Sequence, residues 1–115
     1  MPRLVFLNAL PLNAFPIDEY GLKIGIVKVS LYSVKPLVKD WARAGVPIEC
    51  YIRHRATVEL LNKLLGLDMK PSDGLYRYSD GDKIIVVTLK KPLRGQEVDV
   101  KPQDIVFYIA EVEEE

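Results

Sequence analysis

The consecutive residues Arg53, His54 and Arg55 combine side chains that are well suited to work on a phosphodiester. A short apolar segment precedes them and apolar residues at helical spacing follow, so they are expected to open a helix. Unpaired amides and a partial positive charge make a helix N-terminus an anion site, and arginines add bidentate phosphate donors. Histidine ordinarily titrates near neutral pH and can protonate a leaving oxygen. The three residues therefore predict metal-free phosphodiester cleavage, with an ordinary polar surface turn as the alternative interpretation.

Two asparagines flank the loop after the first predicted strand, Asn8 at its start and Asn13 further along. Loops at the carboxyl ends of strands are where α/β sheets bind ligands, and amide side chains can read bases or riboses through paired donors and acceptors. Asparagine also closes strands by bonding to its own backbone, so ordinary turn chemistry is the alternative.

A cationic loop containing Lys91 and Arg94 follows a later apolar segment. Such a loop could close over phosphates. Its lysines could equally protect the edge of a strand, and the charge alone does not decide between the two.

Few other kinds of site are compatible with the sequence. It contains neither a GxxxxGK[ST] nor a GxGxxG phosphate-binding loop. With one cysteine, Cys50, and one histidine, it cannot build a zinc site of the usual Cys/His type. The aspartates are spaced as turn residues rather than as magnesium ligands, so we expect no metal and no cofactor.

The periodicity of apolar residues predicts one small α/β domain with a mixed sheet flanked by two main helices. Strands are expected at residues 3–7, 22–29, 48–52, 75–78, 83–89 and 105–109, the fourth and fifth as a hairpin. The first helix is expected at residues 33–44, capped by its first residue and with Pro36 in its first turn. The second helix ends at Gly66 and begins either after Thr57 or, as its length favours, at Arg53-His54.

The chain has 115 residues and a mass of 13.1 kDa, which suits one domain. Its formal net charge is zero, but four of its 16 acidic residues and none of its 16 basic ones lie in residues 111–115. We assign the domain to residues 1–110, which carry a small positive excess, and residues 111–115 to an acidic, solvated tail. This balance gives no reason to expect stable binding to a nucleic-acid duplex. Without a signal sequence or an apolar run of about 20 residues, the chain is expected to be cytoplasmic and to have no contact with a membrane.

Two segments resemble the viral type III anti-CRISPR ring nucleases, a family of small α/β proteins from archaeal viruses with cellular relatives. Residues 6–13, Phe-Leu-Asn-Ala-Leu-Pro-Leu-Asn, are similar to the family's x-Asn-Ala-Phe-Ser-x-Asn loop. Residues 52–66 begin Ile-Arg-His-Arg-Ala-Thr and end Leu-Leu-Gly, which is similar to the family's Ile-Gly-His-x-x-Thr and its helix ending Leu-x-Gly. The second segment is the more specific, and the order of elements resembles the family over nearly the whole chain.

The resemblance implies a homodimer that binds cyclic tetra-adenylate, a second messenger of type III CRISPR defence, across the dimer interface. In the family, a ribose 2′-hydroxyl attacks the neighbouring phosphorus without a metal, and a histidine protonates the departing 5′-oxygen. The products are linear di-adenylates that end in a 2′,3′-cyclic phosphate. By this resemblance His54 is the general acid, and Asn8 and Asn13 contact the adenosine groups. The phosphate contacts fall on the backbone near Ile52 and on the side chains of Arg53, Arg55, Lys91 and Arg94.

This chain departs from the family at four functional positions. One is an arginine expected before the hairpin, in whose place the chain has Ser72-Asp73-Gly74. Pro11 stands where the family has a serine, Arg53 where it has a glycine, and Arg94 where it has a supporting glutamate. Loss of a positioned carboxylate implies turnover slower by a factor on the order of tens to hundreds. Two alternatives therefore accompany the ring nuclease. One is a protein that sequesters or senses the ring without cutting it, and the other is a small nucleic-acid or protein-interaction domain.

Overall fold

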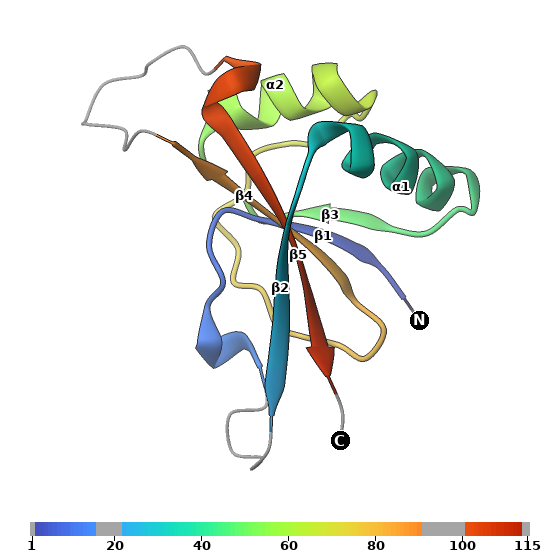
Figure 1. Ribbon diagram of the computed structural model, residues 1–115, viewed down its shortest axis with the longest axis vertical. Helices are drawn as coiled ribbons and strands as arrows, with labels where there is room; N and C mark the ends of the chain where they lie inside the picture. The colour runs from blue at the N-terminus through green and yellow to red at the C-terminus, as the bar shows by residue number, and fades with distance from the viewer. Residues whose placement is uncertain (1, 16–21, 91–100, 114–115) are drawn as a thin grey trace.

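Five strands form one mixed sheet in the computed structural model, which describes residues 2–15, 22–90 and 101–113. The strands are β1 (Leu4–Leu7), β2 (Lys23–Val29), β3 (Ile48–Cys50), β4 (Lys83–Leu89) and β5 (Ile105–Glu113), in the order β2-β5-β4-β1-β3 (Figure 1). β1 pairs in parallel with β3 and β4, whereas β5 runs antiparallel to β4 and β2. The predicted α/β domain with a mixed sheet is confirmed.

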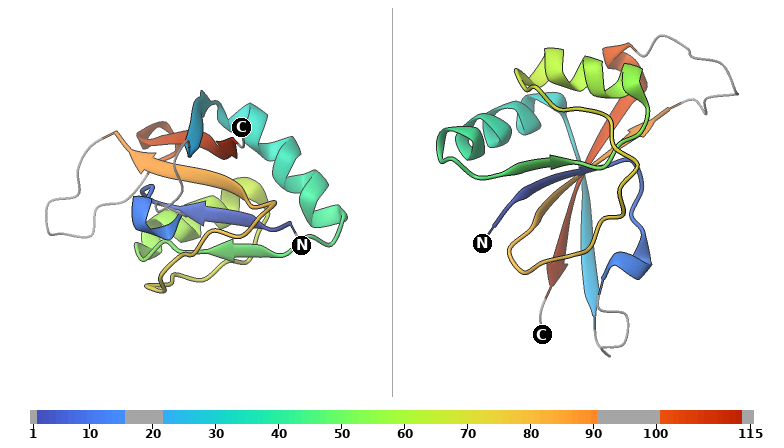
Figure 2. Two further views of the ribbon diagram at one scale, coloured as in Figure 1. Left: turned by 90° about the horizontal axis from the view of Figure 1, so that it is seen from below. Right: turned by 180° about the vertical axis from the view of Figure 1, so that it is seen from behind.

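The two predicted helices, α1 (Leu31–Arg43) and α2 (Arg55–Leu65), are present and pack on the same face of the sheet (Figures 1 and 2). The side chains that they turn inward are fully buried: Val34, Val38, Val58 and Leu61. These side chains pack against Leu4 and Phe6, because alternate residues of β1 face the helices. No helix in the described part of the chain is long and apolar enough to cross a membrane.

α1 begins two residues earlier than predicted. Ser30, not Ser33, is its cap, and the Ser30 hydroxyl oxygen accepts a hydrogen bond from the Ser33 amide at 3.3 Å. Pro36 consequently lies inside the helix rather than in its first turn. An amide at this position would have bonded to the carbonyl of Tyr32. Tyr32 is 84% exposed, so water can satisfy that carbonyl instead.

The second face of the sheet is covered by chain outside helices α1 and α2, namely the loop that contains the short 3-10 turn η1 (Leu12–Ala14) and the segment of residues 76–78. Phe15 and Tyr76, only 4% and 5% exposed, pack there with Val5 of β1. β1 is therefore buried on both sides, which explains why its sequence is an uninterrupted apolar run.

The predicted hairpin of residues 75–78 and 83–89 is wrong in its first half, because residues 75–78 form no strand. The Tyr78 amide donates to the carbonyl of Ala14 at 2.9 Å, and the Tyr78 ring lies 5.5 Å from the ring of Phe15. The alternating pattern of this segment is typical of a strand. Its tyrosines, however, serve to cover the sheet rather than to extend it.

Two strand ends also differ from the prediction. β3 stops at Cys50, two residues early, whereas β5 continues to Glu113. Glu111, expected in the acidic tail, therefore lies in β5, where its carboxylate accepts a hydrogen bond from Lys83 Nζ at 2.7 Å.

Candidate functional site

The carboxyl ends of three parallel strands meet at one edge of the sheet, with β1 between β3 and β4. Phe6 pairs with Cys50 of β3, and Leu7 pairs with Val86 of β4, so the segments that leave β1 and β3 start side by side. The chain reaches β3 on one side of β1 and then β4 on the other, which makes β1 a topological switch point. Open α/β sheets bind ligands at such a point.

Two of the predicted ligand-binding residues lie in the loop that follows β1 at this edge of the sheet. Asn8 directly follows the strand, and Asn13 lies in η1. The loop is anchored by Phe15 and by a 3.0 Å hydrogen bond from the Ala14 amide to the carbonyl of Pro11. Both asparagine side chains are exposed, and neither forms a hydrogen bond with a described residue. A purely turn-forming role would bond these amides to their own backbone, so the geometry favours side chains available to a ligand.

His54 is the N-cap of α2, which confirms the earlier of the two predicted helix starts. Its Nδ1 accepts the amide N–H of Thr57 at 3.3 Å and lies 2.7 Å from the Thr57 hydroxyl. Among the described residues, no group bonds to Nε2 of this partly buried ring. The ring is thus held by one nitrogen and offers the other to a ligand.

The first turn of α2 provides the components of an anion site. Within the described part of the chain, the amides of Arg55 and Ala56 have no acceptor, whereas the Thr57 amide is bonded to His54. The side chains of Arg53 and Arg55 are both exposed beside these amides. Unpaired amides at a helix N-terminus together with two guanidinium groups favour a phosphate.

Ile52 can contribute to this site only through its backbone. Its side chain is 1% exposed and belongs to the core beneath the helices, and its carbonyl accepts the Ser72 amide at 2.9 Å. The neighbouring thiol of Cys50 is partly buried, and burial raises its pKa. A raised thiol pKa is typical of a packed cysteine and not of a nucleophile.

The remaining two predicted phosphate ligands, Lys91 and Arg94, lie outside the described residues. In sequence they follow β4, which ends at Leu89 and pairs with β1. Their phosphate-binding role stays a prediction.

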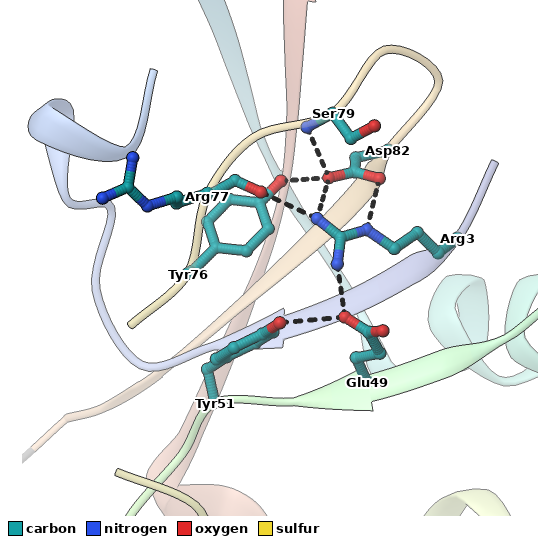
Figure 3. A network of polar contacts seen from close by, with 7 residues as sticks. All are labelled: Arg3, Glu49, Tyr51, Tyr76, Arg77, Ser79 and Asp82. Carbon is teal, nitrogen blue, oxygen red and sulfur yellow. Dashed lines mark hydrogen bonds and ion pairs between the residues drawn. The ribbon is translucent and has the colours of Figure 1, made fainter. Parts of the chain in front are cut away.

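A polar network that the sequence did not indicate lies at the opposite ends of the same strands (Figure 3). Arg3 donates from Nε and Nη2 to the two carboxylate oxygens of Asp82, at 2.8 and 2.9 Å, and from Nη1 to Glu49 of β3. The fully buried Asp82 carboxylate also accepts hydrogen bonds from the Tyr76 hydroxyl and the Ser79 amide. In the described residues, every buried polar side-chain atom has a partner. This network therefore stabilises the fold, and its buried side chains offer no unsatisfied polar atom to a ligand.

The hydrogen bonds of the network fix its protonation states. Burial by itself raises the pKa of Asp82, but the bonds from Arg3, Tyr76 and the Ser79 amide outweigh it and hold the pKa below its usual range. Burial and the bond to Asp82 raise the pKa of Tyr76, so this hydroxyl remains a neutral donor. The bond to Asp82 also raises the pKa of Arg3. Asp82 is thus a carboxylate at neutral pH.

A groove of about 510 Å³ lies between α1 and the C-terminal end of α2, at the other end of that helix from His54. Its lining includes Val38, Leu64, Lys35 and Lys39, but none of the predicted site residues. The described residues contain no group of three or more His, Cys, Asp or Glu side chains that could hold a metal ion. The candidate site is therefore the exposed edge at the ends of β1 and β3.

Comparison with known proteins gives one family and one fold. A model of the STIV B116-like family matches residues 4–108, a range that includes all the predicted site residues. Among solved structures, B116 of Sulfolobus turreted icosahedral virus (STIV) is similar, with a TM-score of 0.73 and 18% identity over 94% of this chain and 97% of that chain. At this identity, the likeness concerns the fold alone. The comparison with curated proteins finds no match.

Proposed function

This chain belongs to the STIV B116-like family, named after a protein of an archaeal virus, and we propose that it binds cyclic tetra-adenylate and cleaves it without a metal. The products are linear di-adenylates that end in a 2′,3′-cyclic phosphate. Residues 6–13 and 52–66 support this function through their resemblance to ring nucleases. The observation that carries it is the placement of His54 at the start of α2, with Nε2 unbonded by any described residue next to the anion site.

The proposed reaction needs only groups of the ring, of this site and of solvent. The ribose 2′-oxygen forms a bond to the adjacent phosphorus and loses its proton to solvent, while the bond from phosphorus to the 5′-oxygen breaks. Protonated His54 gives its Nε2 proton to that oxygen and regains a proton from solvent. The amides of Arg55 and Ala56 and the arginine side chains hold the phosphate, and Asn8 and Asn13 contact adenosine groups.

A second candidate function is sequestration or sensing of the same ring without turnover. It is favoured by Arg94, which replaces the glutamate of the resembling family. A third, binding to linear nucleic acid, would be strongly salt-dependent and indifferent to ring closure.

We expect purified protein to convert labelled cyclic tetra-adenylate to di-adenylate in excess chelator, and His54→Ala protein to leave it intact. Resolving the products by chromatography over a long incubation tests this. Tight binding of cyclic tetra-adenylate without cleavage would contradict the nuclease function and support the second candidate function, sequestration or sensing. Equal, salt-sensitive retention of linear and cyclic tetra-adenylate would contradict both.

We also propose that the protein acts as a homodimer, and that β2 lies in the interface. β2 is an edge strand whose outer side pairs with no described strand. Its neighbouring side chains Ile26 and Val27 are 55% and 62% exposed. An apolar edge strand is a surface that a folded protein normally covers.

The wild-type protein is accordingly expected to sediment at twice the 13.1 kDa mass of one chain. A double Ile26→Lys, Val27→Lys variant should sediment as a monomer, because charged side chains at these positions would have to lose water in the interface. Tyr32→Lys, a change at an even more exposed residue of α1, is the control and should remain dimeric. A monomeric wild type, or a dimeric double variant, would remove β2 from the interface.

A further inference from the structure

The Nδ1 atom of His54 contacts two different groups of one residue. The Thr57 amide nitrogen lies 3.3 Å from Nδ1, and the Thr57 hydroxyl oxygen lies 2.7 Å from it. Thr57 is 3% exposed, so water has little access to replace the hydroxyl. Only the cap contact is needed to begin a helix, and the hydroxyl contact calls for a separate explanation.

The two contacts place different demands on Nδ1. An amide N–H can only donate, so it requires a lone pair on Nδ1 and favours the neutral tautomer with hydrogen on Nε2. A hydroxyl can donate to that lone pair or accept from a protonated Nδ1. The hydroxyl is therefore the one partner that suits both states of this nitrogen.

The acid step in the proposed function requires the state that the amide disfavours. Protonated His54 carries hydrogen on both nitrogens, and after Nε2 gives its proton to the 5′-oxygen, the neutral ring retains hydrogen on Nδ1. With the amide as its only neighbour, this N–H would face another donor. The Thr57 hydroxyl, at 2.7 Å, can accept it.

We propose that Thr57 is a positioning residue whose hydroxyl reverses from donor to acceptor. It would thereby hold the His54 ring in place when Nδ1 carries hydrogen and can no longer accept the Thr57 amide. This inference rests on the proposed role of His54 as general acid. Thr57 touches no reacting atom in this scheme. Its effect is exerted wholly through the histidine.

The test compares Thr57→Val, which keeps the shape and the backbone amide but removes the hydroxyl, with Thr57→Ser, which restores it. We expect Thr57→Val to lower kcat by about tenfold or more, a share of the 10²–10⁴ that a general acid contributes, with the Kd for the ring unchanged. Thr57→Ser should recover most of the rate. A loss of affinity with an unchanged kcat would contradict a positioning role.

Nuclear magnetic resonance gives a readout that needs no ligand, because His54 is the only histidine of the chain. In acid enough to protonate the ring, wild-type and Thr57→Ser proteins should show a slowly exchanging Nδ1–H proton, and Thr57→Val should lose it. The same slowly exchanging proton in Thr57→Val would overturn the inference. If Thr57→Val does not fold, Thr57→Ala gives the same comparison. If the wild-type protein is inactive, the proposed function is wrong. The Nδ1–H signal would still show whether the Thr57 hydroxyl accepts the hydrogen of His54 Nδ1.

Discussion

Replacing His54 by Asn is expected to slow the cleavage of cyclic tetra-adenylate at least about a hundredfold while α2 stays capped. The asparagine side-chain oxygen can accept the Thr57 amide as Nδ1 does, since Asn is among the preferred N-cap residues. It has no proton to give to the departing 5′-oxygen. Single-turnover rates measured beside thermal unfolding curves should therefore show a large loss of rate and little loss of stability.

His54→Ala separates the two roles of this residue. It removes the acid and the cap together, so it should lose as much activity as His54→Asn and, in addition, about 1 kcal/mol of stability. Binding of the uncut ring should survive in both variants, because the amides of Arg55 and Ala56 remain. Cleavage by His54→Asn at the wild-type rate would mean that another group is the acid.

The placement of His54 was predictable because the signals that fix it are local. Apolar residues at helical spacing lead to Gly66, which takes the left-handed conformation (φ of 68°) that ends the helix. Counting back from that end gives a helix that starts near His54. The exact partner of His54 was not predictable. Thr57 could itself have capped a shorter helix, and only the structure shows that it contacts the histidine instead.

Features that depend on distant residues were missed or wrong. The Leu-Tyr-Arg-Tyr pattern of residues 75–78 is that of a strand, but its tyrosines pack against Phe15, about sixty residues earlier. Arg3 and Asp82 are 79 positions apart, and each alone looks like an ordinary polar residue beside a strand. Only the parallel pairing of β1 with β4 brings them together.

The start of α1 shows a different limit. Ser30 and Ser33 are both acceptable caps, so propensity alone could not choose between them. Pro36 favoured the later start, because proline is common in a first turn. The structure tolerates an interior proline instead.

Asp82→Ala is expected to lower the free energy of unfolding by about 3 kcal/mol or more, the largest stability loss that we expect from a single change. The change removes the carboxylate that accepts two hydrogen bonds from Arg3. It also leaves the buried hydroxyl of Tyr76 without its acceptor. Glu49 still accepts one bond from Arg3, which places the loss at the lower end of the range for broken buried ion pairs. Urea unfolding at neutral pH measures it.

The effect should also depend on pH, with a definite sign. The folded-state pKa of Asp82 lies below its usual value, so its contribution is complete above the unfolded value of about 3.9 and is lost as the pH falls through the folded pKa. The gap between wild-type and Asp82→Ala stabilities should therefore be constant near neutrality and close in acid. Glu111→Ala is the control, since its 2.7 Å ion pair with Lys83 is exposed and should contribute about 1 kcal/mol or less. If Asp82→Ala lowered the free energy of unfolding no more than this control does, the hydrogen bonds and ion pair of Asp82 would not be a main source of stability.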